Sequence, residues 1–139
     1  MSHKKAQAII QTCIDFRFRK ALNDFIENEL NLYDVDLKTD GGGVKKIVEE
    51  GPIRDWIFAN YQIAFDLHGV ERVILINHQD CGAYGGSQAF QGEEDEIAKH
   101  EIQLRHATSV IRAKFPTKQI EAYLALINSD GEVSFKKVE

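Results

Sequence analysis

The sequence predicts an α/β fold, in which a mostly parallel five-stranded sheet is flanked by helices and ends in an antiparallel C-terminal hairpin. The apolar run at 73–76 is typical of a strand that is buried on both faces, and residues 7–13 have the pattern of another buried strand. Strand patterns and helix patterns alternate along most of the chain, which indicates parallel strands joined by crossover helices. A polar, glycine-rich loop follows the run at 73–76. Open α/β sheets bind their ligands at such loops, beyond the carboxyl ends of the strands.

The first half of the chain begins with the strand at 7–13, which breaks into a polar loop. Apolar residues at helical spacing predict a helix over 18–30. Alternation predicts a second strand over 32–38, followed by another polar glycine loop. Pro52 favours a helix start, and this helix ends at His68-Gly69. Its expected inner face consists of Ile53, Trp56, Ile57, Asn60, Ile63, Ala64 and Leu67.

The second half begins with the strand at 73–76 and its loop, and a polar stretch at 88–95 follows. A helix is expected over 96–114, ended by Pro116, and its His100 and His106 are expected to face solvent. The strands expected at 120–127 and 132–138 are joined by Asn128-Ser129-Asp130-Gly131, which has the composition of a hairpin turn.

Composition limits the classes of protein to consider. We expect all 139 residues to form one domain, with 43% hydrophobic and 28% charged residues as in ordinary globular proteins. A net charge of −5 argues against nucleic-acid and anionic-membrane partners. No apolar run approaches the ~20 residues of a membrane span, and the opening residues do not resemble a signal peptide. A cytoplasmic location is therefore expected, where the two cysteines stay reduced.

Two short motifs carry the chemistry. Cys13-Ile14-Asp15-Phe16-Arg17 follows the first strand, and His78-Gln79-Asp80-Cys81-Gly82 follows the third. If those strands are neighbours in a parallel sheet, Cys13 meets His78 and Cys81. Two thiolates and an imidazole suit zinc and leave a fourth coordination position open. The alternatives are a buried cysteine beside a helix-capping histidine and a thiol-redox pair, although the chain has no Cys-x-x-Cys motif.

The two motifs resemble those of the β-class carbonic anhydrases, Cys-x-Asp-x-Arg and His-x-x-Cys-Gly. Weaker similarity at 67–75 and 120–138 extends the resemblance over nearly the whole chain. It implies the fold of that family and reversible hydration of carbon dioxide to bicarbonate by zinc-bound hydroxide.

The resemblance also implies roles for individual residues. Cys13, His78 and Cys81 are the implied zinc ligands, and Asp15 accepts a hydrogen bond from the zinc-bound water or, in a closed form, is the fourth ligand. Arg17 is implied to keep Asp15 ionised and oriented. Asp80, between the ligands, is expected to cap the loop or to support the ligands from outside the metal's coordination shell.

The chain departs from the family pattern near the site. Lys38-Thr39-Asp40-Gly41-Gly42 stands where the family has Arg-Asn-Ala-Gly, and Asn77 replaces the glycine before the histidine. The central helix has Asn60 and Ile63 where the family has serine and tyrosine. These changes leave two alternatives open, a hydrolase of carbonyl sulfide or carbon disulfide, and a catalytically idle zinc protein.

The expected partners are the small-molecule substrate and a second copy of the chain. Active sites of the family lie at a subunit interface, so a homodimer or higher homo-oligomer is expected. The chain starts almost at its first strand, so we expect it to dimerise without the N-terminal arm that often wraps the partner. Trp56, Phe16, Phe58 and Phe65 are expected in the core or in a dimer contact.

Overall fold

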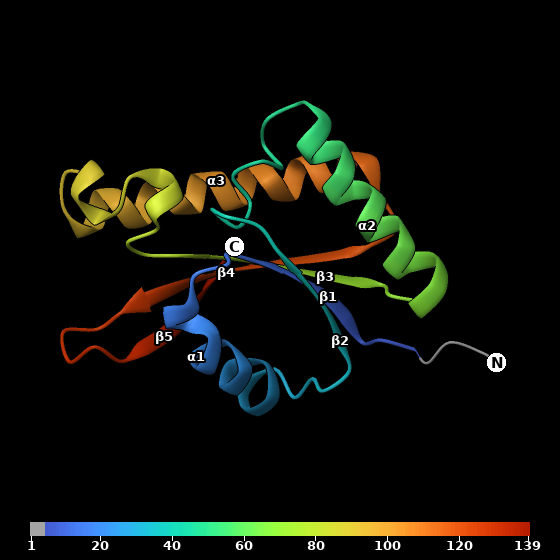
Figure 1. Ribbon diagram of the computed structural model, residues 1–139, viewed down its shortest axis with the longest axis horizontal. Coiled ribbons are helices and arrows are strands. Elements are labelled where there is room, and N and C mark those ends of the chain that lie inside the picture. Colours follow the sequence, from blue (N-terminus) through green and yellow to red (C-terminus); the bar gives the residue numbers. More distant parts are fainter. Residues whose placement is uncertain (1–4) are drawn as a thin grey trace.

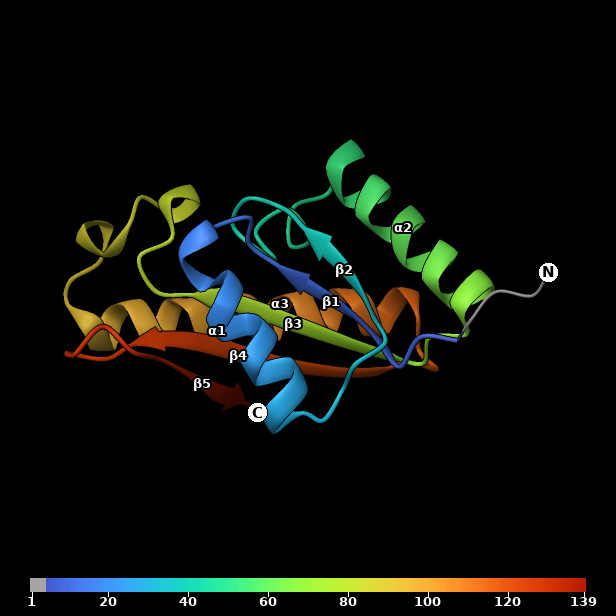
Figure 2. The ribbon, with the colours of Figure 1, turned by 60° about the horizontal axis from the view of Figure 1, so that its bottom comes forward.

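The computed structural model describes residues 5–139. The first four residues lie outside the described part, so the expectation about the opening segment is not tested. The sheet has five strands in the order β2-β1-β3-β4-β5 (Figure 2). All pairings are parallel except β4 with β5, which confirms the predicted sheet. The helices and strands are β1 (Ala8–Thr12), α1 (Arg19–Asp24), β2 (Val35–Thr39), α2 (Pro52–His68), β3 (Arg72–His78), α3 (Glu93–Lys114), β4 (Gln119–Ile127) and β5 (Val133–Val138).

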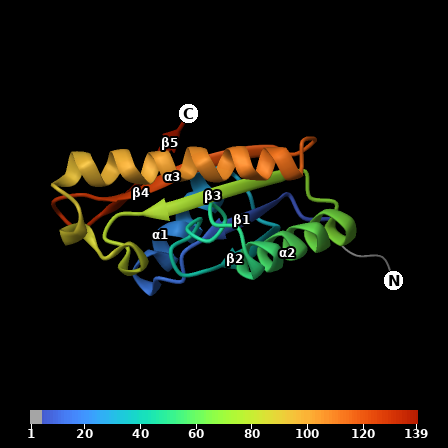
Figure 3. The ribbon, with the colours of Figure 1, turned by 90° about the horizontal axis from the view of Figure 1, so that it is seen from above.

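The sheet lies between two layers of helices. Helices α2 and α3 cover one face and α1 covers the other (Figures 1 and 3). On β3, Val73 and Leu75 belong to the core under α2 and α3, whereas Ile74 and Ile76 belong to the core against α1. The central strand is therefore buried on both faces, as its continuous apolar run predicts.

The helix expected over 18–30 is divided into three pieces. A 3₁₀ turn at Phe16–Phe18 leads into α1, and a π-helical turn at Phe25–Glu29 follows it. Strand β2 then begins later than the expected residue 32. The reason is that the buried Leu32 closes the helix end, where its N–H donates to the carbonyl of Ile26 at 2.9 Å.

The expected inner face of α2 is largely wrong. Ile53, Trp56, Ile63 and Leu67 are 49%, 63%, 50% and 47% exposed. The buried face consists of Ile57, Phe58, Tyr61, Ala64 and Phe65. The aromatic rings explain this rotation, because Phe58, Tyr61 and Phe65 gather around Phe115, the residue that follows α3.

Helix α3 begins at Glu93, one turn before the expected residue 96. Gly92 precedes it with φ 96°, and the first turn carries four acidic residues. Negative side chains are favourable at a helix N-terminus, where the backbone N–H groups are unpaired. Within residues 5–139, no helix has both the length and the apolar character needed to cross a bilayer.

Candidate metal centre

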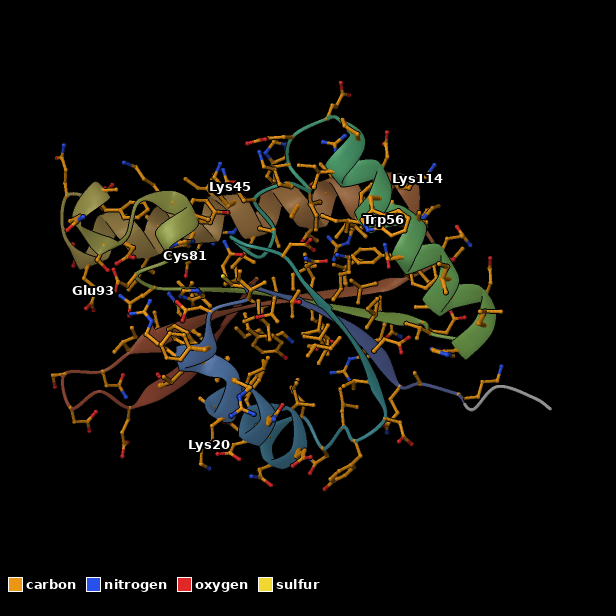
Figure 4. All side chains as sticks on the ribbon, in the orientation of Figure 1. Lys20, Lys45, Trp56, Cys81, Glu93 and Lys114 are labelled. Atoms are coloured by element: carbon orange, nitrogen blue, oxygen red, sulfur yellow. The ribbon has the colours of Figure 1, made fainter. Side chains whose placement is uncertain are left out.

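Three side chains meet at the carboxyl ends of β1 and β3. Cys13 directly follows β1, and His78 is the last residue of β3. Cys81, which Figure 4 labels, lies in the loop after β3. Because β1 and β3 pair in parallel, both strands deliver their polar ends to the same edge of the sheet. One nitrogen of His78 and the two sulfur atoms lie within 4.8 Å of one another.

The imidazole of His78 is held in the tautomer that metal binding requires. Its Nδ1 lies 2.6 Å from the carbonyl oxygen of Gln79, which can only accept a hydrogen bond. Nδ1 therefore carries a proton, and in the neutral ring Nε2 keeps its lone pair. Nε2 is buried and has no hydrogen-bond partner among the described residues. A backbone carbonyl on the second nitrogen is the usual arrangement for a metal-binding histidine.

The two thiols lie close enough to share a proton. Cys13 Sγ and Cys81 Sγ are 3.9 Å apart, and Cys81 is buried. The hydrogen bond with Cys81 lowers the pKa of Cys13, and the same bond, with burial, raises the pKa of Cys81. A thiolate is the ligand form of cysteine. The donor set of two sulfurs and one free imidazole nitrogen fits zinc.

Asp15 stands beside this group and is held by Arg17. Its Oδ2 lies 3.7 Å from His78 Nε2. Arg17 Nη2 donates to Oδ2 at 2.7 Å, and Arg17 Nε lies 3.1 Å from both carboxylate oxygens. The Arg17 side chain, more than any other group, lowers the pKa of Asp15. Asp15 is therefore an oriented, ionised acceptor at the edge of the candidate centre.

Arg17 also ties the two motifs together. Its Nη1 donates to Asp80 Oδ2 at 3.0 Å and its Nη2 to the Asp80 carbonyl at 2.9 Å. Asp80 Oδ1 accepts from the backbone N–H of Ser87 at 2.9 Å, which caps the loop after Cys81.

Sequence reasoning missed a second anchor of this loop, Glu96. This residue of α3 is 2% exposed, and its carboxylate accepts from Asp80 N at 2.7 Å and from Ser87 Oγ. The only signal in the sequence is its place among four acidic residues at a helix start, which does not distinguish it from its neighbours.

The departure at Asp40 is neutralised locally. Lys38 Nζ donates to both carboxylate oxygens of Asp40, at 3.0 and 2.9 Å, and Gln11 Nε2 donates to Oδ2 at 2.7 Å. The additional carboxylate is thus paired with the lysine two residues before it. Gln11 is fully buried on β1, and its role was not predicted.

His100 is buried, so the prediction that it faces solvent is wrong; His106 is exposed as expected. The Nδ1 atom of His100 lies 3.2 Å from Asn77 Nδ2, and the ring of His100 packs edge-on against Tyr84. Burial lowers the pKa of His100 to about 4, so the ring is neutral near pH 7. Asn77, which stands where the family has glycine, explains why His100 is buried. The buried amide of Asn77 reaches from β3 to α3 and needs a polar partner there.

An apolar cavity opens beside Asp15 and His78. It has a volume of about 250 Å³, and its polar wall includes Thr12, Cys13, Asp15 and His78. Most of the other lining residues are apolar, namely Ile14, Phe16, Phe18, Leu22, Leu37, Ile76, Ala125 and Phe135. A small apolar molecule can therefore lie next to the candidate metal ligands.

Known proteins resemble this chain in sequence and in structure. An uncharacterised protein of Rickettsia conorii is 28% identical over 135 residues, which cover 93% of this chain and 71% of that protein. The crystal structure of β-carbonic anhydrase isoform I from Trichomonas vaginalis superposes with a TM-score of 0.64 at 14% identity, covering 97% of this chain and 85% of that one. A structure of tetrameric β-carbonic anhydrases from Sordaria macrospora gives a TM-score of 0.57 at 16% identity, covering 95% and 81%.

The sequence also matches a family model described as "Putative carbonic anhydrase" over residues 1–136, nearly its whole length. At these identities the solved structures show the fold, and the family match shows the relationship. The chain therefore belongs to this carbonic anhydrase family and has the β-carbonic anhydrase fold.

Proposed function

We propose that this protein is a zinc-dependent enzyme of the cytoplasm that reversibly hydrates carbon dioxide to bicarbonate. The observation that supports this most strongly is the cluster of Cys13, His78 and Cys81 ligand atoms within 4.8 Å, with Asp15 fixed beside it. Zinc held by these three residues would act as a Lewis acid and lower the pKa of a water molecule bound to it, although less than a zinc ion held by three imidazoles, because two thiolates donate more charge.

The protein's own residues have separate tasks in this proposal. The buried apolar walls of the cavity, including Phe18, Leu22 and Ile76, bind carbon dioxide beside the candidate ligands. Asp15 accepts a hydrogen bond from the attacking water and so orients its lone pair towards carbon. Because Arg17 occupies both oxygens of Asp15, the geometry supports the open form, in which Asp15 is not a ligand.

The test is stopped-flow measurement of carbon dioxide hydration on the zinc-loaded protein between about pH 6 and about pH 9. The lowered pKa of Asp15 keeps this carboxylate ionised throughout that range. We therefore expect the rate to rise with pH as the attacking water ionises. Zinc-loaded protein with no rate above the buffer blank at any pH contradicts the proposal. Hydrolysis of carbonyl sulfide and carbon disulfide, assayed on the same samples, then separates the related hydrolases from an idle zinc protein.

We further propose that the protein forms a homodimer through the outer α2 stripe, which consists of Ile53, Trp56, Ile63 and Leu67. These apolar side chains recur at helical spacing on the exposed side of α2. Trp56, one of them, is labelled in Figure 4. Strand β2 forms the edge of the sheet on this side of the molecule. An exposed apolar stripe of this kind is typical of an interaction site.

Trp56→Asp is expected to weaken dimerisation by roughly 30-fold or more, because a charge replaces the largest apolar side chain of the stripe. Sedimentation equilibrium at micromolar concentration measures this. Ile102→Asp is the matched control, since Ile102 is comparably exposed but lies on α3. A parent protein that is monomeric under these conditions would contradict the dimer.

A further inference from the structure

The thiol of Cys13 has a backbone partner outside the three candidate ligands. The N–H of Gly42 points at Cys13 Sγ, with an N···S distance of 3.4 Å. Gly42 belongs to the glycine loop, Asp40–Gly43, which directly follows β2. Gly42 and Gly43 have φ values of 89° and 63°, a conformation that glycine adopts readily. Hydrogen bonds to a ligand sulfur change its electron donation to a metal.

One side of the glycine loop is held by a buried amide on β1. Gln11 Nε2 donates to Asp40 Oδ2 at 2.7 Å and to the carbonyl of Gly43 at 3.1 Å. Its Oε1 accepts from the hydroxyl of the buried Tyr61 at 2.8 Å, which orients the amide. Gln11 therefore holds the loop at both its first and its last residue.

The other side of the loop rests on a buried amide of β3. Asn77 Oδ1 accepts from Val44 N at 3.1 Å, while its Nδ2 lies 3.2 Å from both Tyr84 Oη and His100 Nδ1. A Cβ atom at Gly43 would lie 2.4 Å from Asn77 Oδ1. The glycine loop is thus in close contact with Asn77, and the side chain of Asn77 has little freedom to move.

The two amides lie on the same side of the sheet. Residues 9, 73 and 75 contribute to the core under α2 and α3, and alternation places Gln11 and Asn77 on that face too. The neighbour of Asn77, His78, points to the opposite face, where Phe18 packs on its ring. One strand end therefore carries a candidate ligand on one face and a support of the loop on the other.

We propose that Gln11 and Asn77 are positioning residues of the metal centre. They hold the glycine loop so that Gly42 N–H donates to the Cys13 thiolate, and this bond limits how much charge the sulfur donates to the metal. The inference rests on the proposed metal site and deepens it. It also assigns a role to Asp40 and Asn77, two residues that differ from the family pattern, because both side chains support this loop.

The test uses the full-length protein, labelled with ¹⁵N and loaded with ¹¹³Cd, a spin-active substitute for zinc. A hydrogen bond from Gly42 N–H to a cadmium-bound thiolate transmits scalar coupling from the amide proton to ¹¹³Cd. We expect this coupling in the parent protein. A parent that shows ¹¹³Cd coupling to the Cys13 β-protons but none to Gly42 would overturn the inference and leave the metal site standing. A parent that takes up no cadmium overturns the metal site, and this inference with it.

Two variants test the positioning role. Gln11→Met and Asn77→Ala are expected to lose the Gly42 coupling and to weaken zinc binding about 10–100-fold, the range for groups that support metal ligands. In the cobalt-substituted proteins, the thiolate-to-cobalt absorption band should move to longer wavelength, because the sulfur donates more charge. Ile26→Ala is the control, since it removes a buried side chain from the core on the opposite face of the sheet and destabilises the fold there. Its coupling, band and affinity should match the parent, whereas variants of Gln11 and Asn77 that match the parent in all three would overturn the proposal.

Discussion

Asp15→Asn is expected to lower the turnover of carbon dioxide hydration by roughly 10²–10⁴-fold, the range for a positioned acid–base group. The substitution keeps the size of the side chain but replaces one acceptor oxygen with a donor. It also removes the charge that pairs with Arg17. Zinc content should stay at the parent level, because no thiol or imidazole is changed. Stopped-flow hydration and metal analysis on the same samples measure both quantities.

Arg17→Ala should change turnover in the same direction, because it frees Asp15 to bind the metal and block the water. Lys20→Ala is a matched control, since Lys20 also pairs with an aspartate, Asp24, but is fully outside the site and mostly exposed. Its turnover should equal that of the parent. Asp15→Asn with parent-level turnover would show that the carboxylate has no part in the reaction.

Cys81→Ser is expected to reduce zinc binding by more than the ~10–100-fold that changes around metal ligands cause. The hydroxyl of serine does not ionise near neutral pH, so a soft anionic ligand is lost. His78→Ala should have a comparable effect, because it removes the free Nε2. Competition with a chromophoric chelator measures the affinities.

The control for these ligand variants is His106→Ala, which removes an exposed histidine of α3 and should leave the zinc affinity unchanged. A folded parent protein that contains no zinc and takes none up would rule out the centre altogether.

The parts of the fold that could be predicted are those that depend on local patterns. The run Val73–Ile76 indicated a buried strand, and the alternation of strands and helices indicated a mostly parallel sheet, in which β1 and β3 pair. Cys13, His78 and Cys81 were found because they stand at strand ends, where the topology makes them converge.

The parts that could not be predicted depend on partners far away in the chain. Asn77 and His100 form a buried pair across 23 residues, and Gln11 reaches Asp40 across 29. Asparagine and glutamine are mostly exposed in proteins, so the sequence pattern does not show which distant partner a buried one has. The inner face of α2 was misjudged for a related reason, because Phe58, Tyr61 and Phe65 pack on Phe115, which belongs to another element.

The separation of Cys13 and Cys81 along the chain, 68 residues, has a consequence for folding. A metal bound to both closes a long loop, and a permanent cross-link of that length would remove unfolded-state entropy worth about 4 kcal/mol in the chain-entropy treatment. A metal that binds only the folded protein acts differently, because it dissociates on unfolding and stabilises the native state by mass action. The gain in the free energy of unfolding then rises with the logarithm of the free metal concentration. If zinc fills the proposed centre in this reversible way, the thermal stability of the protein depends on the free zinc concentration, and a melting temperature describes it only at a stated zinc concentration.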